Sequence, residues 1–303
     1  MASTIELPAS KAAYQAARFK ELSLMVRAFR QDRLAVVSLV IILLFVVGAG
    51  FAPWLAPYPL EGKGAPHIEA KFQPPSREHF LGTEQLGRDV LSRILYGGRS
   101  SLTIGFLVVA VAVLIGVPMG ALAGYYGGWL DNILMRITDV FLAFPPLLLA
   151  IAVASALGPS FTNAMIAIAV TWWPWYARLV RAQTLSLRER YFVEAARSIG
   201  VSDLTIIVRH VLPNVLTPVL VQSTMDVGSA ILTGAAISFV GLGVQPPTAD
   251  WGEMISTGRI YFIQRPWVAG SAGAAIFLVT LAFNLFGDAL RDVADPRTRR
   301  AMK

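Results

Sequence analysis

The chain has 303 residues, of which 55% are hydrophobic and 15% charged, and its formal net charge is +7. Soluble domains usually carry about 25% charged residues. The low share of charged residues indicates a membrane protein, because burying a charge in lipid is costly. The basic residues form no compact patch, so no nucleic-acid partner is expected. The absence of cysteine excludes disulfides, thiolate metal sites and cysteine nucleophiles in this chain.

The apolar segments predict an all-α membrane protein with about six spans, because a bilayer-sized helix needs about 20 apolar residues. The expected spans are 34–55, 102–125, 137–157, 164–180, 215–240 and 268–290. The first follows a long polar stretch and is expected to be an uncleaved span, since a signal peptide has its apolar region near the N-terminus. The layout is an N-terminal tail (1–33), a first transmembrane helix (34–56), an external segment (57–100), a core domain (101–292) and a C-terminal tail (293–303).

Lysine and arginine gather in the two tails and in the loop between the fourth and fifth spans. Cytoplasmic segments carry such an excess, and an even number of spans places all three on one side. Both termini are therefore expected in the cytoplasm. The external segment also carries bases, which weakens the rule.

Glycines and prolines mark two of the expected spans. In the second, Gly116, Gly120 and Gly124 recur every four residues, so one face lacks side chains and another helix can approach closely. In the third, Pro145 and Pro146 cannot donate helical hydrogen bonds, and a break or kink is expected there.

The polar loop at 191–214, between the fourth and fifth spans, is predicted to form two short helices joined at a turn. Gly200 follows a run of good helix formers, at the position where glycine ends helices. Ser202 can cap the second helix, and Asp203 lies in its first turn, where the helix dipole favours an anion. Pro213 is expected to interrupt the chain before the fifth span.

An apolar stripe is predicted on the second of these helices, where four residues fall at i, i+3, i+4 and i+7. They are Leu204, Ile207, Val208 and Val211. Such a stripe needs either a partner surface or, alternatively, this protein's own spans or the membrane interface. On the first helix, small side chains at 195 and 196 would let a partner backbone come close, and Glu194 offers a charge.

The loop reads YFVEAARSIGVSDLTIIVRHVLPN, and it resembles the EAA loop of bacterial ABC importer permeases. Four further blocks resemble the C-type permease of the peptide and nickel branch: FLGTEQLGRDVLSRILYGGRSSL (80–102), ITDVFLAFPPLLLAIAV (137–153), ISFVGLGVQPPTADWGEMI (237–255) and FNLFGDALRDVADPR (283–297). His210 stands where the general pattern has isoleucine, as it often does in the peptide branch. Gly234 stands where many branch members carry glutamate.

The resemblance implies a type I importer permease fold, with about six transmembrane helices, in the bacterial inner membrane. It implies an ATPase-coupling loop that contains Glu194, Ala195, Ala196, Gly200, Ser202, Asp203, Leu204, Ile207, Leu212 and Pro213. The implied partners are a second, B-type permease, two ATPase subunits and an extracytoplasmic substrate-binding protein. The implied solute is a dipeptide, an oligopeptide or a related small molecule.

No Gly-x-x-x-x-Gly-Lys-Ser/Thr phosphate loop occurs in the chain. ATP and magnesium are therefore expected on the partner ATPases, with no catalytic residue, cofactor or metal in this subunit. A secondary transporter that works without an ATPase is the alternative. It would need coupling carboxylates in its spans and often an internal repeat. The sequence has few carboxylates in its expected spans and no clear repeat.

Asp226 lies in the expected fifth span, where an ionisable residue is a functional candidate by default. It could line a water-filled path and attract the ammonium group of a peptide, or it could be paired structurally. An interfacial aromatic belt is expected near the cytoplasmic end of the fourth span, with solute stacking as the lesser alternative. Its members are Trp172, Trp173 and Trp175.

Two other pairs of charged residues are expected to be structural. Arg136 and Asp139 are spaced as a helix-end ion pair at i, i+3. Arg88 and Asp89, in the external segment, are expected to hold local structure, with a binding-protein contact as the alternative. The three histidines do not have the spacing of metal ligands.

Overall fold

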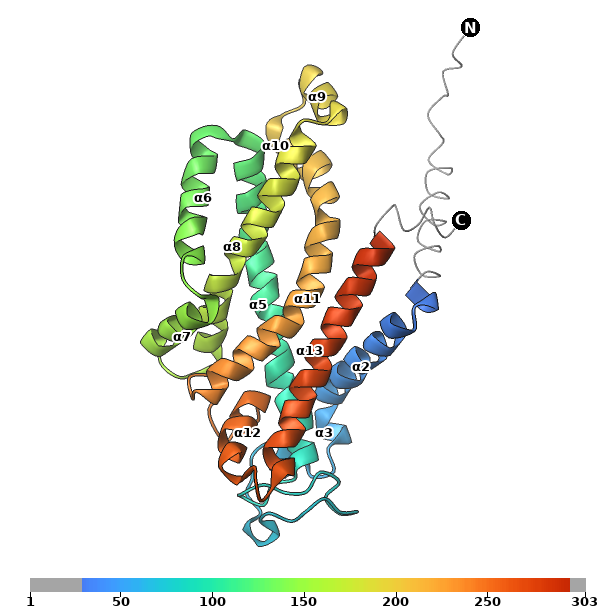
Figure 1. Cartoon of the computed structure of the whole chain (residues 1–303), viewed down its shortest axis with the longest axis vertical. Coiled ribbons are helices and arrows are strands. Elements are labelled where there is room, and N and C mark those ends of the chain that lie inside the picture. Colours follow the sequence, from blue (N-terminus) through green and yellow to red (C-terminus); the bar gives the residue numbers. More distant parts are fainter. Residues whose placement is uncertain (1–28, 295–303) are drawn as a thin grey trace.

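Helices of very different lengths, most of them roughly aligned, make up the computed structural model, which describes residues 29–294 (Figure 1). The longer helices are α2 (Arg33–Gly50), α5 (Val90–Tyr126), α6 (Gly128–Leu142), α7 (Pro146–Leu157), α8 (Phe161–Arg188), α11 (Leu212–Phe239) and α13 (Pro266–Ala294). The short ones are α3 (Ala52–Leu55), α4 (Pro59–Gly62), α9 (Tyr191–Ser198), α10 (Asp203–Ile206) and α12 (Trp251–Gly258). The predicted tails, 1–33 and 293–303, lie largely outside the described residues.

Four stretches of the described chain are long and apolar enough to cross a membrane: α2, α5, the continuous helix Asp203–Phe239, and α13. The bent pair α6 and α7 makes a fifth if it counts as one span. α8 has the length of a span at 28 residues, but arginines in its second half make it less apolar. With α8 included, the count reaches the six that the sequence predicts.

The third expected span, 137–157, is not one straight helix. α6 and α7 meet at 84°, with Pro145 at the N-cap position of α7 and Pro146 in its first turn. The predicted break is therefore confirmed. Its cause is that neither proline has an N–H to bond the preceding turn.

Close packing of α5 against α8 follows from the predicted glycine face. A Cβ added at Gly116 would lie 2.5 Å from the carbonyl oxygen of Trp173, and one at Gly124 would lie 2.7 Å from the Thr184 Cβ. A Cβ at Gly120 would overlap the Ala177 carbonyl. The expectation of a close helix neighbour is confirmed, because there is no room for side chains on this face.

Several boundaries differ from the sequence prediction, two of them at α5 and α11. α5 begins at Val90, so part of the expected external segment forms its first turns. Pro213 does not interrupt the chain, because a π-helical segment, Ile207–Val211, joins α10 to α11 in one helix. The Asn214 side-chain amide donates to the His210 carbonyl at 2.6 Å, which supplies a donor near the one that Pro213 lacks.

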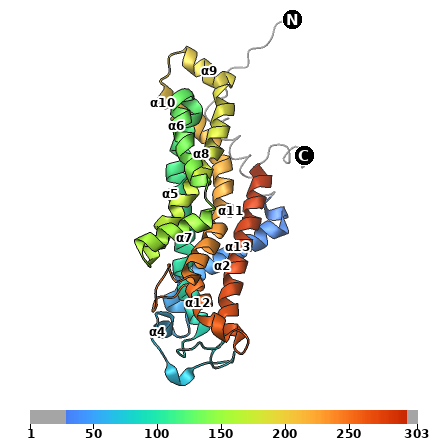
Figure 2. The same cartoon turned by 60° about the vertical axis from the view of Figure 1, so that its left-hand side comes forward.

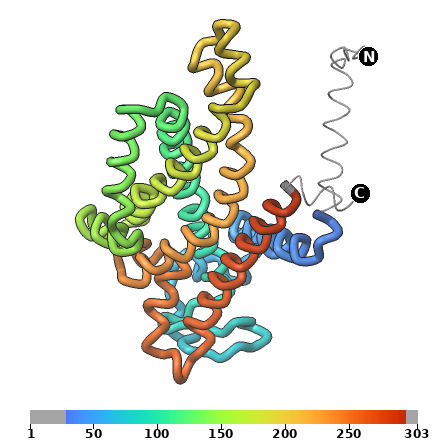
Figure 3. Tube along the Cα trace, turned by 45° about the horizontal axis from the view of Figure 1, so that its top comes forward, coloured from blue at the N-terminus to red at the C-terminus, as the bar shows by residue number. Residues whose placement is uncertain are grey.

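The two ends of the molecule are built differently. Helices α9 and α10 form one end of the long axis, and α13 runs toward that end (Figures 1 and 2). The segment between α3 and α5 lies beside the turn around α12 at the opposite end (Figure 3). The N-terminal side of α2 lies near the end of α13, where Phe29 packs edge-on against Phe286 at 5.5 Å.

Candidate functional site

The 191–214 loop folds as two helical segments around a tight turn. Gly200 adopts φ +80°, a left-handed conformation that suits glycine, directly after α9. Ser202 occupies the N-cap position of α10, but its hydroxyl contacts that of Thr205 at 2.8 Å and makes no bond to the helix backbone. The predicted turn is present, and the predicted side-chain cap is not.

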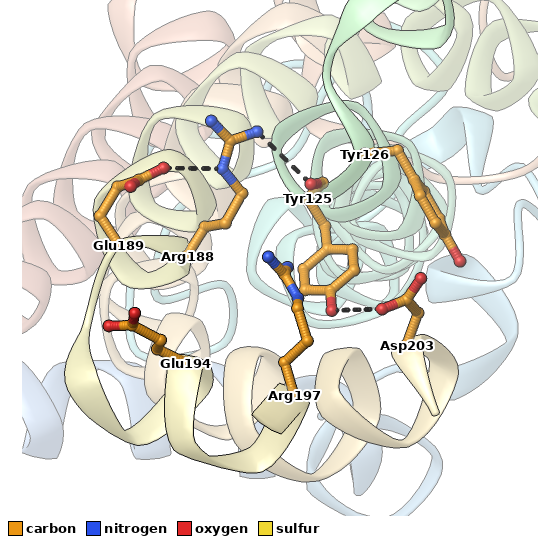
Figure 4. Close-up of a pocket in the computed structure, with 7 residues that line it drawn as sticks. All are labelled: Tyr125, Tyr126, Arg188, Glu189, Glu194, Arg197 and Asp203. Atoms are coloured by element: carbon orange, nitrogen blue, oxygen red, sulfur yellow. Dashed lines mark hydrogen bonds and ion pairs between the residues drawn. The ribbon is translucent and has the colours of Figure 1, made fainter. Parts of the chain in front are cut away.

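A polar cleft of about 600 Å³ separates this loop from the ends of α5 and α8. The seven side chains that line it converge from four helices (Figure 4). Tyr125 donates to Asp203 at 2.7 Å, and the Arg197 guanidinium lies over the Tyr125 ring. Arg188 bonds Glu189 at 3.0 Å and reaches back to the carbonyl oxygen of Tyr125. The loop is therefore held to α5 and α8 by polar contacts.

The predicted apolar stripe divides between two surroundings. Ile207 and Val211 are buried within this chain, so the alternative of packing on its own helices is correct for them. Leu204 and Val208 are exposed, by 67% and 52%. Of the four residues of the stripe, only Leu204 and Val208 are therefore accessible to a partner.

The outer surface of α9 and the turn adds residues that sequence reasoning did not select. Tyr191 is 90% exposed and Ile199 80% exposed, at opposite ends of α9. Glu194 and Ala195 are exposed on the same helix, whereas Ala196 is buried. Of the remaining predicted loop residues, Pro213 is exposed and Leu212 half-buried. The signal for Tyr191 and Ile199 was their apolarity in a polar loop.

A second cavity, of about 640 Å³, lies among α7, α8 and α11, and is called here the Asp226 cavity. Its lining includes Pro146, Trp172, Trp175, Arg178, Gln222 and Asp226. The Gln222 amide donates to the Asp226 carboxylate at 3.0 Å. The structure thus brings together a carboxylate and two tryptophans that the sequence treated separately.

The predicted end of the fourth span is wrong, and the interfacial aromatic belt stays a prediction. The three tryptophans lie in the middle of α8, because that helix continues to Arg188, well beyond the predicted end at 180. Trp173 is buried edge-on against Phe141 at 5.3 Å, while Trp172 and Trp175 face the Asp226 cavity.

The predicted pair of Arg136 with Asp139 is also wrong. Asp139 accepts a 2.6 Å bond from Arg178, across from α8, and both side chains are half exposed. About one turn further along α8, Arg181 forms a bidentate pair with Asp131 at 2.5 and 2.6 Å. The two aspartates of α6 therefore face α8, a relationship that local spacing could not show.

Buried charge pairs stabilise the end of the molecule opposite the loop. Arg88 bonds Glu84 at 2.8 Å, and Asp89 contacts His79 at 2.9 Å, so both residues hold local structure. Arg93 bonds Glu253 of α12 at 3.1 Å. Burial raises the pKa of the Glu253 carboxyl, and the charge of Arg93 opposes that rise. Within the described residues, no group of three or more acidic or histidine side chains could hold a metal ion.

The sequence of this chain matches two known protein families. Residues 116–300 match the family described as the binding-protein-dependent transport system inner membrane component. The chain belongs to this family. Residues 22–75 of the permease match a second family, the N-terminal transmembrane domain of oligopeptide transport permease C. Together with the curated relatives that follow, the two matches confirm the expected peptide-branch, C-type permease of an ABC importer.

Curated relatives cover nearly the whole permease. The dipeptide transport system permease protein DppC of Alkalihalophilus pseudofirmus is 44% identical over 90% of this chain and 89% of its own. The probable D,D-dipeptide transport system permease protein DdpC of Escherichia coli is 46% identical over 87% and 88%. The glutathione transport system permease protein GsiD of Escherichia coli is 45% identical over 90% and 89%.

A solved structure supports the fold. An inward-facing form of the MetNI methionine ABC transporter superimposes on the permease with a TM-score of 0.54 and 20% identity, covering 66% of this chain and 95% of that one. The expected importer permease fold is therefore confirmed. This protein is an integral inner-membrane permease subunit of an ABC importer.

Proposed function

We propose that this permease forms half of a path for dipeptides or related small peptides, and that separate ATPases drive it through the 191–214 loop. The exposed apolar surface of that loop carries the proposal. Tyr191, Ile199 and Leu204 are exposed on α9, the turn after it and α10, and these helices form one tip of the molecule (Figure 1). Apolar side chains exposed together at a tip mark a partner surface.

The proposed assembly contains three kinds of partner. A second, B-type permease supplies the other half of the path, two ATPase subunits carry ATP and magnesium, and a binding protein delivers the solute. Both termini and the loop lie in the cytoplasm, and the segment with the buried charge pairs lies outside. Dipeptides and glutathione are named for the relatives, so a short peptide is the proposed solute.

Co-purification tests the docking surface directly. Leu204→Glu places a charge on the proposed surface and is expected to lower recovery of the ATPases with the tagged permease. Leu60→Glu is the matched control, because Leu60 is 71% exposed on α4 at the opposite end. Unchanged ATPase recovery with Leu204→Glu and Ile199→Glu would contradict the docking role.

Transport in proteoliposomes separates this function from a secondary transporter. The assembled complex is expected to take up peptide only when ATP reaches the ATPases, and uptake is expected to persist when ionophores collapse ion gradients. Gradient-driven uptake by the permease alone would overturn the proposal.

A further inference from the structure

The Asp226 carboxylate lies in a transmembrane helix without a counter-ion. Among the described residues it forms no ion pair, and its hydrogen-bond neighbours are the neutral side chains of Gln222, Tyr176 and Trp172. A carboxylate at membrane depth normally pairs with a cation or faces water, because its desolvation is costly. Here it faces a cavity.

The nearest cation of the cavity wall is already engaged. Arg178 lines the same space, but its guanidinium is bonded to Asp139 at 2.6 Å. That pair is electrically balanced without Asp226. The Asp226 cavity therefore contains one carboxylate that has no cationic partner among the described residues.

Aromatic side chains complete the wall around that charge. Trp172 and Trp175 line the cavity from α8. Tyr176, on the same helix, is 1% exposed, and its side chain is one of the hydrogen-bond neighbours of Asp226. Tryptophan faces attract cations, most strongly where water is scarce. A carboxylate beside aromatic rings, with no cation already bonded to it, is suited to an organic cation.

We propose that the Asp226 cavity binds a protonated primary amine, the chemistry that a peptide presents at its N-terminus. The volume of about 640 Å³ lies within the range of small-molecule sites and exceeds what an ammonium group alone fills. Asp226 supplies the charge, and Trp172 and Trp175 supply aromatic walls. The inference rests on the proposed function for its setting, since a peptide path must hold such a group in transit.

Equilibrium dialysis of the assembled complex in nanodiscs tests this without transport. The probe is radiolabelled alanyl-alanine amide, which carries one positive charge at neutral pH, and its neutral match is the N-acetylated form. The wild type is expected to bind the charged probe saturably and the neutral one at least about tenfold more weakly. N-acetyl-lysine amide, whose amine is on the side chain, distinguishes recognition of an α-amine from that of any primary amine.

Three variants make the result specific. Asp226→Asn is expected to weaken binding of the charged probe at least about tenfold, and Asp226→Glu, which keeps the charge, is expected to recover most of it. Asp288→Asn removes an exposed carboxylate of α13 outside the cavity lining and is expected to bind like the wild type. Recovery of the partner subunits reports whether each variant assembles.

Absence of saturable binding to the wild type, or equal binding by Asp226→Asn and the wild type, would overturn the inference. If ATP-dependent uptake persists while Asp226→Asn binds normally, the amine site is wrong and the proposed function stands. If the wild type binds the amine through Asp226 but shows no ATP-dependent uptake, the site stands and the proposed function fails.

Discussion

The hydroxyl of Tyr125, in the last turn of α5, donates a 2.7 Å hydrogen bond to Asp203, the first residue of α10. The guanidinium of Arg197 lies 5.5 Å from the centroid of the same ring. Because α10 continues into α11, this contact joins two long helices at the loop proposed to meet the ATPases. Movement of the loop therefore bears on both helices at once.

Removing that hydroxyl is expected to uncouple transport from ATP turnover. Tyr125→Phe keeps the buried ring but loses a bond to a charged group, worth about 1.5 kcal/mol or more. The measurement is the amount of peptide transported per ATP hydrolysed, which is expected to fall a few-fold. Tyr126→Phe is the control, because that neighbouring hydroxyl makes no described hydrogen bond. An unchanged ratio in Tyr125→Phe would exclude a coupling role for this bond.

The turn after α9 is expected to be sensitive to the backbone alone. Gly200 has φ +80°, yet a Cβ there would meet no atom within 4 Å. Gly200→Val is therefore expected to cost about 1–2 kcal/mol through conformation and not through a clash, and to lower transport while leaving membrane insertion intact. Gly200→Asn is expected to retain most activity, since asparagine tolerates this conformation. Equal activity of the two variants would count against the argument.

The contact of α5 with α8 is expected to tolerate no added methyl group. Gly120→Ala would overlap the Ala177 carbonyl, and a loss of about 1–3 kcal/mol in stability is expected. Gly273→Ala is the same change in α13, where the added Cβ meets open space, and should be neutral or slightly stabilising. Thermal unfolding of the detergent-solubilised permease gives both values. Similar melting temperatures for the two variants would contradict the close packing.

The buried pair of Arg93 and Glu253 is expected to matter more than an exposed one. Glu253→Gln leaves an uncompensated guanidinium that is 1% exposed, and a loss of about 3–5 kcal/mol is expected. Asp139→Asn breaks a half-exposed pair and should cost about 0–1 kcal/mol. Replacing both members, as Arg93→Met with Glu253→Leu, should recover much of the stability. Failure of the double variant to recover any would point to other roles for these residues.

The sequence was most informative where a residue acts through its own backbone. Pro145 and Pro146 lack the N–H of a continuous helix, and the chain bends there by 84°. Gly200 ends α9 for an equally local reason. Pro213 shows the limit of this reasoning, because a π-helical segment and the Asn214 side chain accommodate it within one helix. That accommodation depends on several residues together.

Contacts between residues of different helices could not be predicted from local sequence patterns. Asp139 was expected to bond Arg136, three residues earlier in the same helix. Its partner is Arg178 of α8, which lies 39 residues away in sequence. The tryptophans of α8 are far from Asp226 in the sequence. Only the packing of α8 on α11 brings Trp172, Trp175 and Asp226 to one cavity. The polar second half of α8 also hid its true length. In each case the missing information was which helix faces which.

The length of α5 has a mechanical consequence. Its 37 residues span about 55 Å, nearly twice the hydrocarbon core of about 30 Å. One helix therefore reaches from Arg93, clamped to α12, to Tyr125, clamped to α10. An axial displacement at one end would be carried along the helix to the other end, and Pro118 is the interior position that cannot donate a helical bond. α5 is therefore a strut between the two ends of the molecule, with one compliant point at Pro118.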